Sequence, residues 1–186
     1  MLYKIFWLLR GACYSLFLGH VGLFSYIGKP LFICGWRKIT IGRNVRIFPG
    51  LRIEAHGSSA SISIKKNVSI AQFVHITAAG NLVIGSDSVI LGFVFITDIE
   101  HEYSNIKLAM RDQAMVVRET KIGSNCFIGF GAAIQAGTIL GDHCIVGAGA
   151  VVRGFYPDYS VIVGVPGRVV KQFDPATGRW LQPAIS

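Results

Sequence analysis

Aliphatic side chains return at every sixth position through much of this chain. The fifteen positions are all Ile, Leu or Val: Ile41, Ile47, Ile53, Ile64, Ile70, Ile76, Ile84, Ile90, Ile96, Ile122, Ile128, Ile134, Leu140, Val146 and Val152. A period of six fits neither an amphipathic helix nor the alternation of a long strand. It is typical of a left-handed parallel β-helix, where each unit is a short strand plus a turn and three units close a triangular coil. The predicted fold is mainly β, with about five coils stacked at roughly 4.8 Å.

The repeat is interrupted after Ile53, after Ile76 and, for much longer, after Ile96. The last interruption spans residues 97–121. Because a long excursion from a compact solenoid is usually functional, we expect it to form a protruding active-site loop. Cys126 and Cys144 are eighteen residues apart and occupy small-residue slots of consecutive coils. We expect both to be reduced core cysteines, and the chain has no C-x-x-C motif that would indicate zinc or redox chemistry.

Residues 1–35 are apolar and aromatic, with sparse basic residues. We expect a helical segment here, followed by the β-helix domain at 36–172 and a tail at 173–186. The longest uncharged stretch, Gly11–Gly28, is eighteen residues, and as a helix it would extend about 27 Å, barely the thickness of a bilayer core. An amphipathic helix on a membrane surface is therefore favoured. A helical cap on the prism and a true span or signal peptide remain alternatives.

The net positive charge of the chain comes entirely from its N-terminal part. The formal net charge is +8, and the first 53 residues contain eight basic residues and no acidic one. The remaining residues contain ten of each sign. A nucleic-acid-binding protein would carry its basic residues along one face of the fold, so we expect no nucleic-acid partner. The pattern predicts instead a protein held peripherally on the anionic inner face of the cytoplasmic membrane.

Three features together resemble one known family. The six-residue repeat is interrupted by Thr97-Asp98-Ile99-Glu100-His101-Glu102-Tyr103, it resumes at Ile122, and it ends in Gly164-Val165-Pro166-Gly167-Arg168. This arrangement resembles the hexapeptide-repeat acyltransferases over about residues 38–172. It looks most similar to the branch that acts on bacterial polysaccharides, the colanic-acid and O-antigen O-acetyltransferases. The resemblance implies acetyl transfer from acetyl-CoA to a hydroxyl or an amine.

The resemblance also implies where the catalytic residues lie. The loop histidine of the family is the general base, and His101 matches it; many relatives carry a second histidine where this chain has Ile99. A sugar hydroxyl needs such a base near neutral pH, and the carboxylate of Asp98, Glu100 or Glu102 could hold the imidazolium. His75, Glu102 and Tyr103 are expected to line the acceptor site.

The family's coenzyme A contacts fall on the last coils and the end element. Phe130 and Ala148 match positions beside the pantetheine arm, while Arg153, Arg168 and Lys171 match basic positions near the phosphates. No metal is expected, because no closely spaced histidines occur. The resemblance further implies a homotrimer with active sites between subunits.

The acceptor predicted is a surface polysaccharide or its lipid-linked precursor. Two alternatives stay open: N-acylation of a nucleotide-linked amino sugar (or acetylation of a small soluble sugar or antibiotic), and a non-catalytic β-helical scaffold.

Overall fold

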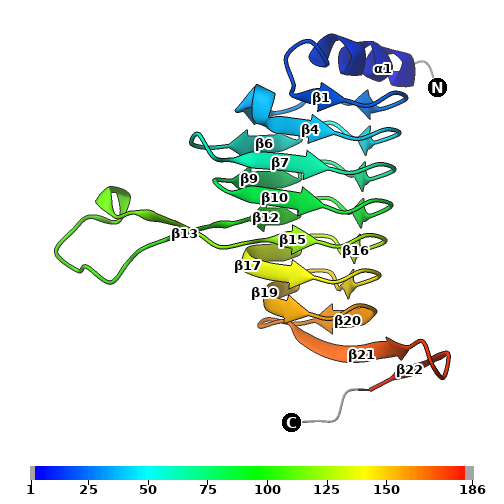
Figure 1. Ribbon diagram of the computed structural model, residues 1–186, viewed down its shortest axis with the longest axis vertical. Coiled ribbons are helices and arrows are strands. Elements are labelled where there is room, and N and C mark those ends of the chain that lie inside the picture. The colour runs from blue at the N-terminus through cyan, green and yellow to red at the C-terminus, as the bar shows by residue number, and fades with distance from the viewer. Residues whose placement is uncertain (1–2, 183–186) are drawn as a thin grey trace.

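In a computed structural model of the protein, which describes residues 3–182, short parallel strands wind into a three-sided prism. One α-helix lies across its N-terminal end, and one long arm leaves its side (Figure 1). The first face contains β1 His20–Val21, β4 Ile39–Ile41, β7 Ser61–Ile64, β10 Asn81–Ile84, β15 Lys121–Ile122, and the C-terminal parts of β17 Ala133–Leu140 and β19 Val151–Tyr156. The fold is the predicted left-handed parallel β-helix.

The other two faces repeat this arrangement. The second face contains β2 Tyr26–Ile27, β5 Arg46–Ile47, β8 Ser69–Ile70, β11 Val89–Ile90, β16 Phe127–Ile128, β18 Ile145–Val146 and β20 Ser160–Val163. The third contains β3 Phe32–Cys34, β6 Arg52–Ala55, β9 His75–Ala78, β12 Phe95–Thr97 and the N-terminal parts of β17 and β19. After β20 the chain reverses into the antiparallel strands β21 Arg168–Asp174 and β22 Arg179–Leu181.

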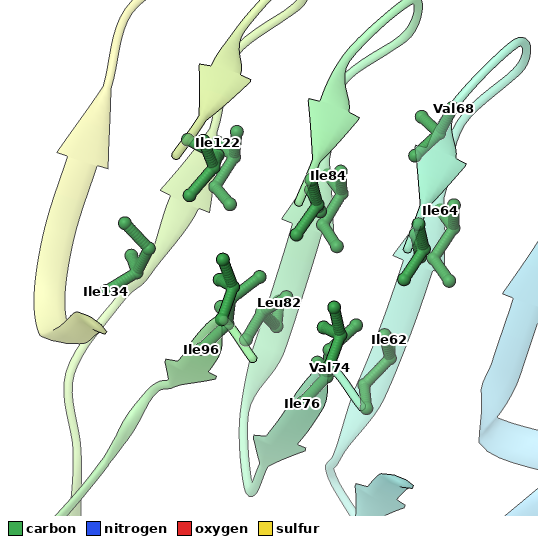
Figure 2. Close-up of a cluster of buried hydrophobic side chains, with 14 of the residues drawn as sticks. Ile62, Ile64, Val68, Val74, Ile76, Leu82, Ile84, Ile96, Ile122 and Ile134 are labelled. Carbon is green, nitrogen blue, oxygen red and sulfur yellow. The ribbon is translucent and has the colours of Figure 1, made fainter. Parts of the chain in front are cut away.

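The six-residue repeat forms the core of the prism. Ile64, Ile84 and Ile122 are aligned on neighbouring strands of the first face, and Ile76, Ile96 and Ile134 on those of the third (Figure 2). All fifteen predicted positions are buried. Cys126 and Cys144 are buried beside them as free thiols, as expected. Each coil therefore buries its aliphatic side chains on those of the next coil, and this burial is the main source of stability.

The N-terminal segment differs from the expectation of a helical segment over residues 1–35. The helix α1 covers only Tyr3–Tyr14, and β1, β2 and β3 already form a first coil. The reason is that Val21, Ile27 and Ile33 also recur every six residues and pair in register with Ile41, Ile47 and Ile53. The described residues thus form more than the predicted five or so coils: β1–β2–β3, β4–β5–β6, β7–β8–β9, β10–β11–β12, β15–β16–β17 and β17–β18–β19, with β20 beginning another.

The helix α1 covers the N-terminal end of the prism. Trp7 packs against Tyr26 and Phe48, with ring centroids 5.8 and 5.7 Å apart, and Gly11 lies against the backbone of Ser25. None of the helices among residues 3–182 is both long and apolar enough to cross a bilayer.

Candidate functional site

Residues 98–120 form an arm that projects from the prism between β12 and β15 (Figure 1). Its base is a two-stranded antiparallel ribbon of β13 Ile99–His101 and β14 Met115–Val117, and a short 3₁₀ helix η2 covers Met110–Asp112. The ribbon begins at the corner between the third and first faces, because β12 belongs to the third face and β15 to the first. The base of the predicted loop is therefore a regular β-ribbon.

Asp98 anchors the arm to the prism. Its side chain is buried, and its two oxygens accept hydrogen bonds from the backbone N–H groups of Ala79 and Gly80 at 2.8 and 2.9 Å. Gly80 has no room for a side chain, since a Cβ atom there would lie 2.6 Å from Val117 Cγ1. Both carboxylate oxygens of Asp98 thus bind this corner of the prism, and no hydrogen bond joins Asp98 to His101 in the described chain.

Glu100 ties the ribbon to a later coil. Its carboxylate accepts two hydrogen bonds from the guanidinium of Arg153 on β19, at 2.9 and 3.0 Å, and a further one from Arg118 on the arm. The pKa of Glu100 is below its ordinary value, chiefly because of the hydrogen bond from Arg118 and secondly because of those from Arg153. The sequence placed Arg153 on the phosphates of coenzyme A. In this structure each terminal nitrogen donates one hydrogen bond to Glu100, and the other three of the five N–H donors of the guanidinium lie outside this pair.

His101, Glu102 and Tyr103 lie farther out on the arm and are exposed. His101 ends β13, opposite Met115, and among the described residues of this chain its imidazole has no hydrogen-bond partner. Glu102 accepts hydrogen bonds from the N–H groups of Tyr103 and Ser104, both at 2.9 Å, and these bonds lower the pKa of its carboxyl. Glu102 thus shapes the turn that follows His101.

A small cleft lies where the arm meets the prism. Its volume is about 220 Å³, and its lining includes Phe95, Thr97, Ile99, Glu100, Gln135 and Arg153. The Glu100–Arg153 ion pair therefore forms part of its wall. The cleft lies on the third face, beside the residues that surround His75.

His75 belongs to a cluster of polar side chains that was not predicted. Its Nε2 lies 3.2 Å from Oε1 of Glu54, a buried carboxylate that also binds Arg52 and, at 3.2 Å, Nε2 of His56. The imidazole of His75 packs on Phe95, with ring centroids 5.2 Å apart. The pKa of Glu54 is below its ordinary value, and the hydrogen bond from Arg52 is the main cause. The six-residue register contained a signal for this cluster, because Arg52 and His75 immediately precede the stacked Ile53 and Ile76.

Three exposed phenylalanines form a ladder along the corner between the second and third faces. Phe73 packs on Phe93 and Phe93 on Phe130, each with centroids 5.3 Å apart; we call this ladder, with Ala148 in the next coil, the aromatic corner. Arg168 pairs with Val163 at the end of β20, whose coil follows that of Ala148. Lys171 lies farther along β21, opposite Val161. Phe130 and Ala148 therefore lie on neighbouring coils of the aromatic corner, as their spacing of eighteen residues implies.

Among residues 3–182, no group of three or more His, Cys, Asp or Glu side chains is arranged to hold a metal ion. The Glu54 cluster is held together by hydrogen bonds and ion pairs.

The sequence is similar to proteins of one enzyme family. Residues 119–154 match the bacterial transferase hexapeptide family (six repeats). The chain is 34% identical over 162 residues to WbbJ of Escherichia coli (strain K12), whose name gives an O-acetyl transferase of lipopolysaccharide biosynthesis; the match covers 81% of this chain and 80% of WbbJ. It is also 34% identical over 134 residues to Rv3034c of Mycobacterium tuberculosis (strain ATCC 25618 / H37Rv), named as an acetyltransferase, covering 72% of this chain and 44% of that protein.

Solved structures with the same fold are also acyltransferases. AntD, an N-acyltransferase from Bacillus cereus crystallised as a point mutant with dTDP and coenzyme A, superposes with a TM-score of 0.76 over 90% of this chain and 91% of its own, at 19% identity. A galactoside acetyltransferase in complex with coenzyme A gives a TM-score of 0.59 over 90% of this chain and 71% of its own, at 23% identity. These likenesses agree in fold, and the match to WbbJ extends over most of both sequences. The chain belongs to the hexapeptide-repeat acyltransferase family.

Proposed function

We propose that this acyltransferase moves an acetyl group from acetyl-CoA to a sugar hydroxyl of a surface polysaccharide or its lipid-linked precursor, with His101 as the general base. The observation that carries the proposal is the similarity to WbbJ over four fifths of both chains. The arm supports it, because His101 stands at the end of a ribbon that Asp98 and Glu100 fix to the prism. The family consists of enzymes, so the scaffold alternative is not retained.

In the proposed reaction the imidazole of His101 accepts the hydroxyl proton while the oxygen attacks the thioester carbonyl. The tetrahedral intermediate then collapses, the C–S bond breaks, and the proton passes from the imidazolium to the thiolate of coenzyme A. The base is needed because an alcohol is a weak nucleophile at neutral pH. A backbone N–H at a coil corner would stabilise the oxyanion.

The donor would lie along the last coils. Phe130 and Ala148 are exposed there, and a Cβ atom at Gly131 or Gly149 would meet nothing within 4 Å, so this part of the corner is open. Arg168 and Lys171 are exposed and would bind the phosphates of the nucleotide by charge-assisted hydrogen bonds. We assign Arg153 to the positioning of the arm, because two of its N–H groups bind Glu100.

The acceptor would be held between the arm and the third face. His75 is half-buried and fixed through Nε2 by Glu54, which leaves Nδ1 for a sugar hydroxyl. Glu102 and Tyr103 are the arm residues assigned to the acceptor, Tyr103 being 71% exposed.

We further propose that the active site is completed by a second copy of the chain in a homotrimer. The arm exposes a row of apolar side chains: Ile106 at 94%, Tyr103 at 71%, Met110 and Met115 at 54%. Exposed apolar patches of this kind are typical of protein interfaces. A neighbouring chain would cover the arm and supply the donor site opposite His101.

The variant His101→Ala tests the base. We expect kcat for acetyl transfer to fall about 10²- to 10⁴-fold with the mass of the assembly unchanged. His143→Ala is the matched control, because His143 stacks on Tyr159 away from the arm. Unchanged release of coenzyme A in the presence of acceptor would remove His101 from the mechanism.

Mixed assemblies test the shared site. Neither His101→Ala nor Arg168→Ala is expected to be active alone, but coexpression of the two should restore part of the activity, because some sites would combine an intact arm with an intact donor corner. Failure to complement would place both residues of each site in one chain.

The acceptor is tested by comparing surface glycans with and without the gene by mass spectrometry. An acetyl increment on a glycan, removed by mild base, supports O-acetylation. An increment that survives mild base, or one on a nucleotide-linked amino sugar, would favour the N-acyltransferase alternative.

A further inference from the structure

The outer side of α1 is apolar and unpartnered. Trp7, Arg10, Gly11 and Tyr14 of the helix are buried or half-buried, while Phe6 is 63% exposed, Leu9 62% and Ile5 57%. The helix is thus apolar on its outer side as well as its covered side, whereas an ordinary surface helix has a polar outer face.

Apolar side chains of the first coil extend this surface. Leu16 is 75% exposed, Leu23 73% and Phe24 66%. Between α1 and the turn that joins β1 to β2 lies an apolar groove of about 480 Å³, whose lining includes Ile5, Leu8, Leu9, Val21, Leu23 and Phe24. The helix α1 lies across the end of the coil stack, and the arm leaves the stack farther along (Figure 1).

Two basic side chains lie at the edge of the apolar surface. Lys4 lies over the ring of Tyr26 at 5.8 Å, and Arg43 over the ring of Phe24 at 5.4 Å. The first acidic residue in the sequence is Glu54, and its carboxylate is buried against Arg52. The surface therefore has an apolar centre and a positive rim, and among residues 3–182 neither Lys4 nor Arg43 forms an ion pair.

We propose that this end of the prism docks on an anionic phospholipid bilayer, with α1 lying flat in the interface. A bilayer supplies both groups that the surface lacks, hydrocarbon for the apolar side chains and anionic head groups for Lys4 and Arg43. A second copy of the same surface is disfavoured, because it would bring the two positive rims together. The docked enzyme would meet acceptors that are themselves carried on a membrane lipid, and only this consequence rests on the proposed function.

Sedimentation with lipid vesicles tests the docking on the full chain. We expect binding to vesicles of equimolar phosphatidylcholine and phosphatidylglycerol, and much weaker binding to phosphatidylcholine alone. Lys4→Gln with Arg43→Gln should weaken binding to the anionic vesicles about 30-fold, from about fivefold per basic residue. Phe6→Ser with Leu9→Ser should weaken it about a hundredfold or more.

Two controls separate this surface from general stickiness and from catalysis. Phe155→Ser and Arg179→Gln change exposed residues at the opposite end of the chain, and both should bind vesicles as the parent protein does. His101→Ala should also bind normally, so docking is judged apart from the proposed reaction.

Two results would overturn the proposal. One is an absence of binding to the anionic vesicles, and the other is unchanged binding by the Phe6→Ser, Leu9→Ser variant. If that variant also had a smaller mass in solution, the surface would be an interface between copies of the chain.

Discussion

Arg153 and Glu100 form a bidentate ion pair, with Nη1–Oε1 at 2.9 Å and Nη2–Oε2 at 3.0 Å. Glu100 lies on β13 of the arm and Arg153 on β19 of the prism, 53 positions later in the sequence. A bidentate pair fixes orientation as well as distance. The pair thereby sets the direction in which the arm carries His101.

Replacing Arg153 by Ala should mainly lower kcat. The arm would lose its contact with β19, and a displacement of the base by about 1 Å costs up to about a hundredfold in rate. Thermal stability should change little, because both side chains are partly exposed. Steady-state kinetics with both substrates is the measurement. The variant Arg153→Lys keeps the charge but not the bidentate geometry, so its kcat should lie between those of the parent protein and Arg153→Ala. A raised KM for acetyl-CoA with unchanged kcat would instead return Arg153 to the donor site.

Replacing Asp98 by Asn should destabilise the protein. One of the two N–H groups, of Ala79 or Gly80, would lose its acceptor, at a cost of about 1–3 kcal/mol. Chemical denaturation measures this loss, and Asp112→Asn on the exposed part of the arm is the control. If Asp98 acted instead as the partner of His101, stability would be nearly unchanged and the pH–rate profile would shift.

Replacing Glu54 by Gln should remove a pH-dependent part of the stability. The pKa of Glu54 is lowered in the folded protein, chiefly by Arg52, so the carboxylate stabilises the fold above its ordinary pKa and ceases to do so as the pH falls through the lowered value. At neutral pH the variant should lose on the order of 2 kcal/mol, the range for hydrogen bonds to charged groups. Below about pH 4 the difference should shrink.

The same variant tests the proposed role of His75. Without the carboxylate, the imidazole of His75 loses the partner that fixes its orientation, so KM for the acceptor should rise while KM for acetyl-CoA stays constant. Equal changes in both constants would mean that the Glu54 cluster serves the fold alone.

Substitution of Phe93 tests whether the aromatic corner belongs to the interface between subunits. Phe93 has a φ of 60°, in the left-handed region, and the neighbouring coil places Gly131, with a φ of 67°, at this corner. A bulky residue in this conformation costs roughly 1–3 kcal/mol, yet Phe93 is 58% exposed. We therefore expect Phe93→Gly to leave the stability of the single chain within about 1 kcal/mol of the parent. Its self-association should weaken, as measured by analytical ultracentrifugation with Phe155→Ser as the control. An unchanged mass at all concentrations would exclude this corner from the interface.

The aliphatic repeat predicted the prism because its period is a property of consecutive residues. A side chain that turns inward every sixth position must stack on its equivalent in the next coil, so Ile122 and Leu140, which are eighteen positions apart, could be aligned from spacing alone. Val21, Ile27 and Ile33 have the same spacing, but they lie in a segment whose other residues are mostly apolar. A period cannot be recognised against such a background, and the sequence therefore predicted a helical segment there. The excursion after Ile96 and the position of His101 within it were likewise available from the sequence.

The partners of the polar side chains were decided by the tertiary structure. Asp98 meets the N–H groups of Ala79 and Gly80, and Arg153 meets Glu100, because coil stacking brings together residues whose separation depends on the length of each insert. The positive charge of the first 53 residues was visible in the sequence. That it rims an uncovered apolar surface follows only from the way α1 lies on the first coil, since burial of Trp7 and Gly11 turns Phe6 and Leu9 outward.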